Sequence, residues 1–149
     1  MNNGVTVDAS QVLRMFSELN SRQQKNVYKN ALRKAGRILQ KETKTQLRSV
    51  VGKTINHKNR WDGKTLGSGI KLKVDKKATE AKVHIMGDFR LKVFELGTTT
   101  RRLRKNGANR GRMNASHFFR TAKDNKERAI FDNINQMVEE SITRISKRR

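Results

Sequence analysis

The strongest chemical signal in the sequence is a basic segment at residues 97–115. It contains six Lys and Arg residues and no Asp or Glu, and its three glycines and three asparagines interrupt any long helical pattern. Guanidinium and ammonium groups form charge-assisted hydrogen bonds with phosphates and carboxylates. We therefore expect a long loop that contacts either the DNA backbone or an acidic protein surface. The expected contact residues are Arg101, Arg102, Arg104, Lys105, Arg110 and Arg112.

Side chains that support catalysis are scattered along the chain. The three histidines, His57, His84 and His117, stand in unrelated contexts, and no two have the i, i+4 spacing of a helical metal site. The sequence contains no phosphate-binding glycine loop. Ser68 lies between two glycines, but this turn precedes a strand, whereas a nucleophile elbow links a strand to a helix. We expect no catalytic, cofactor or metal site, and no enzymatic activity.

Length and composition restrict the class of protein. A chain of 149 residues predicts a single domain over 1–149, with a flexible lead-in at 1–8. The net charge of +22 favours a polyanion or an acidic partner, although cations also solvate a domain that has little core. No apolar run is long enough to span a membrane, and the first residues do not resemble a secretory signal. The absence of cysteine excludes disulfides.

Amphipathic helices are predicted in the first third of the chain. A short helix at residues 9–19 precedes a long one that begins at Ser21, where Gln24 completes a capping box, and that ends near Val50. The apolar stripe of the long helix is rich in alanine and lacks tryptophan. This composition favours packing on a sheet over binding to a membrane surface, where the apolar face usually carries aromatic residues.

The middle of the chain predicts a loop followed by strands. Residues 51–69 are rich in glycine and polar residues, and we expect Trp61 to anchor this loop to the body. Apolar and polar residues alternate over 70–75 and 81–85, which is typical of half-buried antiparallel strands. A third strand is predicted over 89–96, where apolar side chains fall on both faces.

A last helix completes the expected fold. It begins near Ser116 or Thr121 and ends near Ser146, and acid-before-base pairs at i, i+4 support it. Together the elements predict an α+β fold. A small antiparallel sheet of three or four strands packs against a long N-terminal helix and a long C-terminal helix.

Four short motifs occur in a fixed order along the chain. They are ALRKAG at 31–36, TLGSGI at 65–70, FELGT at 94–98 and HFFRTA at 117–122. Their order and spacing, which cover residues 22–145, resemble those of the neck or tail-completion proteins of tailed bacteriophages. The chain departs from that pattern in lacking the prolines of the family's last motif and in scrambling the second motif.

The resemblance implies a structural protein of the virion that has no catalytic activity. Such proteins form rings, typically sixfold, at the junction where a finished tail joins a DNA-filled head. The implied partners are further copies of the chain, other neck and tail proteins, and the DNA that passes through the channel, with no membrane and no cofactor. The implied location is the virion neck, after synthesis in the cytoplasm of the bacterial host.

Two alternatives to this interpretation stay open. Within the neck, the chain is either a tail-completion protein or a tail terminator or head-closure protein. Outside it, the charge also suits a small DNA-binding protein without sequence specificity. For the motif residues we expect packing where the third strand meets the last helix, with Gly97 in a conformation that a Cβ would strain. These residues are Phe94, Glu95, Leu96, Gly97, Thr98, Phe118 and Phe119.

Overall fold

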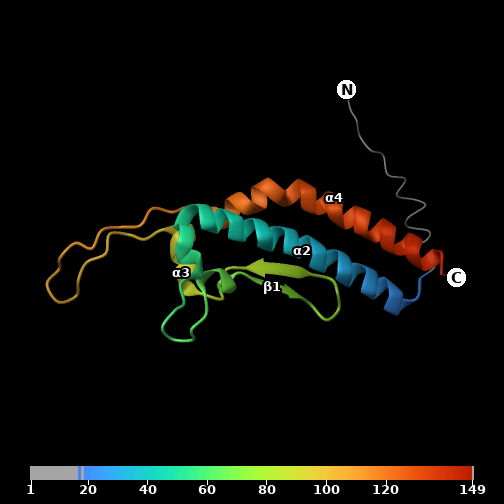
Figure 1. Cartoon of the computed structure of the whole chain (residues 1–149), viewed down its shortest axis with the longest axis horizontal. Helices are drawn as coiled ribbons and strands as arrows, with labels where there is room; N and C mark the ends of the chain where they lie inside the picture. Colours follow the sequence, from blue (N-terminus) through green and yellow to red (C-terminus); the bar gives the residue numbers. More distant parts are fainter. Residues whose placement is uncertain (1–16, 18, 149) are drawn as a thin grey trace, which may run out of the picture.

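The computed structural model describes Ser17 and residues 19–148 of the chain. The lead-in predicted at residues 1–8 lies outside this described part, and so does most of the helix predicted at 9–19. In Figure 1 the described residues form three layers along one long axis. Helix α4 (Phe118–Ser146) covers one side of helix α2 (Ser21–Val51), and a hairpin of β1 (Lys71–Val74) and β2 (Ala81–His84) covers the other.

Helix α2 begins and ends almost where the sequence predicts, but its capping box is shifted by one residue. The side chain of Asn20 accepts the N–H of Gln23 at 2.9 Å, and Gln23 Oε1 accepts the N–H of Asn20 at 3.1 Å. The predicted pair, Ser21 and Gln24, is therefore wrong. Asparagine and serine are equally good N-cap residues, so the local sequence fits both alignments.

The apolar stripe of α2 packs on both neighbouring layers, which confirms the prediction of a helix docked on a sheet. Small residues make the close approach feasible. Ala31 and Ala35 are buried, and at Gly36 a Cβ would collide with the side chain of Leu72 in β1. A larger residue at position 36 would require the Leu72 side chain to move out of this contact.

The described residues contain a sheet of two antiparallel strands, so the prediction of three or four strands is wrong. Leu72 lies opposite Val83 in the register. The turn between the strands is organised by the carboxylate of Asp75, which accepts the N–H groups of Thr79 at 2.8 Å and Glu80 at 3.0 Å. Hydrogen bonds from the backbone, that of Glu80 foremost, lower the pKa of Asp75.

The segment predicted as a third strand is helix α3 (Phe89–Leu96). Asp88 caps it by accepting the N–H of Arg90 at 3.0 Å, and Gly97 ends it at a φ of 71°. A short run with apolar residues at odd and even positions fits a strand and a helix equally well. The cap residues on both sides decide in favour of the helix.

The core consists of two separate clusters rather than one. The larger cluster lies where α2, α3, α4 and the short 3-10 helices η1 (Gly52–Asn56) and η2 (Leu66–Gly69) meet the hairpin. The smaller cluster joins the start of α2 to the end of α4. The buried residues are Leu47, Ile55, Leu66, Ile70, Ile85, Leu91 and Phe118 in the first cluster, and Leu19, Val27 and Ile142 in the second.

Candidate functional site: a basic arm on a hydrogen-bonded joint

The basic segment predicted as a loop is a long, paired arm, which we call the basic arm (residues 98–113). Its two sides are joined by backbone hydrogen bonds from Thr98 N–H to the Met113 carbonyl at 2.9 Å and from Leu103 N–H to the Ala108 carbonyl at 2.9 Å. Between these, Arg101 and Gly111 are also paired at 2.9 Å. Figure 1 shows the arm extending away from α3 and α4 into solvent.

Local interactions fix the tip of the basic arm. Gly107 has a φ of 67° and donates its N–H to the carbonyl of Leu103 at 2.8 Å. The side chain of Asn106 accepts the N–H of Ala108 at 3.1 Å. The glycines and asparagines that exclude a helix from this segment therefore build its turn.

The six predicted contact residues all lie on the basic arm and are exposed. None of them forms an ion pair with any of the residues that the structure describes, and the arm itself contains no carboxylate. Side chains of like charge on a narrow, projecting hairpin create a positive potential that extends beyond the body. The arm can therefore contact phosphates or carboxylates of a partner without first breaking internal pairs. The six residues are Arg101, Arg102, Arg104, Lys105, Arg110 and Arg112.

The arm leaves the body at a joint between the end of α3 and the start of α4. Glu95, which is buried, accepts the N–H of Phe119 at 2.8 Å and of Arg120 at 3.3 Å through its carboxylate. Ser116 donates both its N–H and its hydroxyl to the carbonyl of Phe94. A carboxylate at the first turn of α4 satisfies free N–H groups and interacts favourably with the helix dipole.

Gly97 confirms the expectation that a side chain would strain this position, although it ends a helix and not a strand. Its φ is 71°, and a Cβ would lie 2.5 Å from the carbonyl oxygen of Met113 and 2.7 Å from the nitrogen of Ala115. The returning side of the arm thus occupies the space that any other residue would need. Thr98 Oγ1 strengthens the same contact by accepting the N–H of Met113 at 2.9 Å.

Of the seven residues predicted to pack at this joint, four are large and apolar, and three of these four do so. Phe118 is 1% exposed, and Phe94 and Phe119 are half-buried against the larger core cluster. Leu96 is 60% exposed, so its predicted packing is wrong. In a strand Leu96 would share a face with Phe94, whereas helix α3 turns it outward and buries Leu91 and Glu95 instead.

The structure also shows contacts that the sequence did not predict. Trp61 contacts α3, which agrees with the expectation that it anchors its loop to the body, although the residue is 60% exposed. Its ring centroid lies 5.3 Å from that of Phe89 and 5.6 Å from the guanidinium carbon of Arg90. Arg90 in turn binds the Asp88 carboxylate at 2.7 Å, and this hydrogen bond lowers the pKa of Asp88. The sequence signal was Asp88 itself, a helix-capping residue directly before an apolar run.

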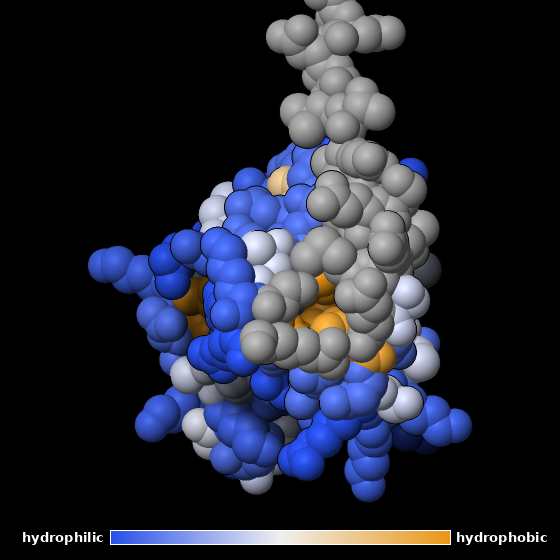
Figure 2. Space-filling model, turned by 90° about the vertical axis from the view of Figure 1, so that its right-hand side faces the viewer, coloured by the Kyte–Doolittle hydropathy of each residue, from blue (hydrophilic) through white to orange (hydrophobic). Residues whose placement is uncertain are grey.

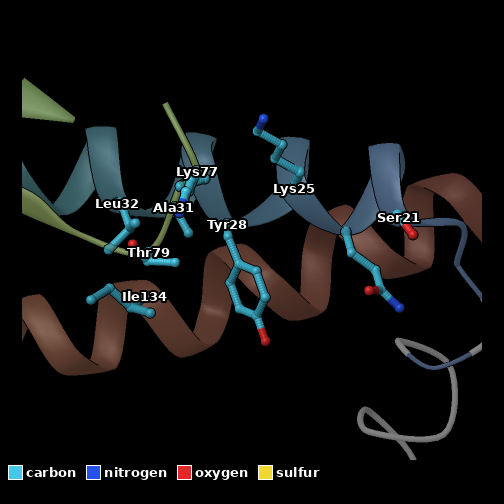
Figure 3. A pocket seen from close by; sticks show the side chains of 10 residues that line it. Ser21, Lys25, Tyr28, Ala31, Leu32, Lys77, Thr79 and Ile134 are labelled. Atoms are coloured by element: carbon cyan, nitrogen blue, oxygen red, sulfur yellow. The ribbon is translucent and has the colours of Figure 1, made fainter. Parts of the chain in front are cut away.

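A groove of about 740 Å³ lies between α2, the β1–β2 turn and α4. Figure 3 shows Tyr28 of α2 directed toward α4, with Ile134 of α4 beside it and Lys77 on the turn. The lining combines apolar side chains with the ammonium groups of Lys25 and Lys77. It contains no carboxylate or histidine, so it does not assemble an acid–base pair.

The histidines do not meet in space as a metal site. Within the part of the chain that the structure describes, no group of three or more His, Cys, Asp or Glu side chains is placed to hold an ion. His84 Nδ1 accepts the N–H of Met86 at 3.3 Å in a local contact. Among the same residues, no helix combines the length and apolarity needed to cross a membrane.

Comparison with known proteins gives no match for this chain among family models, curated proteins or solved structures.

Proposed function

We propose that the chain is a structural protein of the head–tail junction of a tailed bacteriophage, and that it forms a ring that joins the tail to a DNA-filled head. The observation that carries this proposal is the joint beneath the basic arm. Two of the motifs on which the resemblance rests are separated by eighteen residues in the sequence, yet Glu95 of the first binds the N–H groups of Phe119 and Arg120 in the second. The motifs therefore act as one structural unit, which their order in the sequence alone does not require.

The distribution of core and surface supports an assembling protein. The core is split into two small clusters, and large apolar side chains such as Met86 and Leu96 remain at least 60% exposed. Contacts between subunits would bury such side chains at about 25 cal/mol per Å² of apolar surface. A closed ring needs two different surfaces on each subunit, and the arm and the body supply two surfaces of different chemistry.

The proposal is tested by the mass of the particle that the protein forms. Nuclease-treated protein is measured by light scattering at low and at high salt. We expect a closed ring of about six chains at both salts. A monomer at both salts, together with normal virion assembly in a phage that lacks the chain, would contradict the proposal.

The second candidate is a small DNA-binding protein without sequence specificity, for which the positive charge is the supporting observation. In that case we expect the cations to gather on one face. Helix α2 alone carries exposed cations such as Arg22, Lys41 and Arg48 along its length. Exposed cations also lie on the hairpin strands (Lys71, Lys73 and Lys82) and on the basic arm, so they are spread over several elements, which favours the first candidate. The end of the molecule opposite the arm is mostly hydrophilic, with small hydrophobic areas (Figure 2).

A further inference from the structure

Trp61 and Phe89 form an exposed aromatic pair, which we call the aromatic platform. Their ring centroids are 5.3 Å apart and the rings are tilted by 34°. Trp61 is 60% exposed and Phe89 is 64% exposed, and the Arg90 guanidinium also lies over the Trp61 ring at 5.6 Å from its centroid. The two residues come from different elements, the 57–66 loop and the first turn of α3, and neither ring is needed to fill the core.

Both elements hold their aromatic residue in place before any ligand binds. The loop that carries Trp61 is closed by the bond from Asn59 N–H to the Lys64 carbonyl at 2.9 Å, and the buried Asn59 side chain accepts the N–H of Asp62 at 2.8 Å. Phe89 lies in the first turn of α3, next to the cap formed by Asp88. A ligand that stacks on these rings would therefore not have to order them first.

The carboxylates around the aromatic platform are paired with cations, whereas two further cations nearby form no ion pair with the described residues. The two nearby carboxylates are already paired, Asp88 with Arg90 at 2.7 Å and Asp62 with Lys64 at 3.1 Å. Lys58 and Arg60 are exposed on the same loop and form no ion pair with the described residues. The platform therefore combines open aromatic rings with two uncompensated cations.

We propose that the aromatic platform binds single-stranded nucleic acid. Bases stack on Trp61 and Phe89, and neighbouring phosphates contact Lys58 and Arg60. An unpaired strand offers both groups at once, whereas a duplex keeps its bases stacked inside and an acidic protein surface offers carboxylates with few aromatic faces. This site is separate from the basic arm and does not depend on the proposed role in the virion.

The experiment uses the fact that Trp61 is the only tryptophan in the chain. Nuclease-treated, full-length protein is titrated with an oligothymidylate of about 12 nucleotides, which lies within the usual site size. The salt concentration is about 50 mM, because electrostatic contacts weaken at higher salt. We expect quenching of the Trp61 fluorescence that saturates. A duplex of the same length and poly-glutamate serve as comparison ligands and should not quench it to the same extent.

Variants locate the binding site by fluorescence anisotropy of labelled oligonucleotide. Trp61→Ala and Phe89→Ala should each weaken binding of the single strand by about 5- to 150-fold, the usual range for one lost stacking contact. Trp61→Phe keeps an aromatic ring and should retain most of the affinity. The matched control is Phe131→Ala on α4, because Phe131 is also 60% exposed and should leave binding unchanged. Duplex binding should not change in any of these variants.

Four results would overturn the proposal. The first is absence of quenching by the single strand, and the second is equal affinity of Trp61→Ala, Phe89→Ala and the unmodified chain. The third is a loss of duplex binding in Trp61→Ala and Phe89→Ala as large as their loss of single-strand binding, which would assign both ligands to one electrostatic surface. A fourth is equal quenching by poly-glutamate, which would assign the platform to an acidic protein. None of these results bears on the particle mass, so the proposed virion role is judged separately.

Discussion

Glu95 is the residue whose role differs most from its appearance in the sequence. It stands in an octapeptide of five apolar and three charged residues, where a carboxylate suggests a solvent-facing position. The helical period of α3 instead buries it beside Leu91, and its carboxylate accepts the first N–H groups of α4. The FELGT motif was visible in the sequence, but the partner of its acidic residue was not, because the two segments are far apart in the chain.

Replacement of Glu95 by Ala should lower the free energy of unfolding by about 1–3 kcal/mol, because two N–H groups at the start of α4 lose their acceptor. Chemical unfolding in urea measures the change. Glu127→Ala is the matched control, because Glu127 lies exposed on α4, the helix whose N–H groups Glu95 binds. This substitution should change stability by less than about 0.5 kcal/mol. Equal effects of the two substitutions would show that the joint does not stabilise α4.

Gly97 at the joint and Gly107 at the tip of the arm allow a comparison of backbone strain with and without a clash. Gly97 and Gly107 both have positive φ values, 71° and 67°, but only Gly97 has backbone atoms where a Cβ would lie. Gly107→Ala should cost about 1 kcal/mol from conformation alone. Gly97→Ala should cost clearly more, and Gly97→Val more again. Thermal unfolding measures both, and equal losses at the two positions would contradict the close packing at Gly97.

Asp88 predicts a pH dependence of stability. The hydrogen bonds from Arg90 lower its pKa in the folded state below the value in the unfolded chain, which is about 4. Its charged form therefore stabilises the fold above that pH, and the contribution is lost as the pH falls through the folded-state pKa. Asp88→Asn should be less stable than the unmodified chain at pH 7, and the gap should narrow below pH 4 or so. Asp132→Asn, on the exposed face of α4, should not reproduce this narrowing in urea unfolding curves.

At the scale of elements, the sequence predicted the long helices well and the short ones poorly. Helices α2 and α4 span many turns, so their apolar periodicity is clear. Helix α3 has two turns, and its residues fit a strand equally well. The cap residues Asp88 and Gly97 carried the information, but Gly97 was interpreted as the end of a strand. The platform was missed because Trp61 and Phe89 belong to separate segments, and no pattern in the sequence indicates that their rings meet.

The basic arm can be removed without disturbing the joint. Deletion of residues 101–112 leaves the pairing between Thr98 and Met113 and the contacts of Glu95 in place. We expect thermal unfolding within about 5 °C of the full chain, because the arm buries little apolar surface. We also expect loss of tail joining, measured as infectious particles from a phage that carries the deletion. Normal infectivity would contradict the role of the arm, and an unfolded product would contradict the independence of the joint.

At the scale of the whole molecule, the net charge of +22 makes the stability of the fold depend on the salt concentration. Positive side chains lie on α2, on the hairpin and on the arm, and the 13 Asp and Glu residues of the chain offset only part of the charge of its 35 Lys and Arg residues. Such self-repulsion destabilises a compact state, and added salt screens it within about 10 Å at 0.1 M. The melting temperature should therefore rise between about 20 and 300 mM salt. The arm-deleted chain, which lacks six positive charges, should show a smaller rise, and an equal or absent rise would contradict this explanation.

The joint beneath the arm has a further consequence for the continuity of the chain. Helices α3 and α4 are held together by Glu95, Ser116 and Gly97 and not only by the covalent connection through the arm. A protease that cuts after Arg104 or Lys105 at the exposed tip would therefore produce two fragments that stay associated as one folded particle. By the same reasoning, new chain ends or an inserted peptide at the tip would leave the body intact. The arm can thus change in length or connectivity without loss of the folded body that the structure describes.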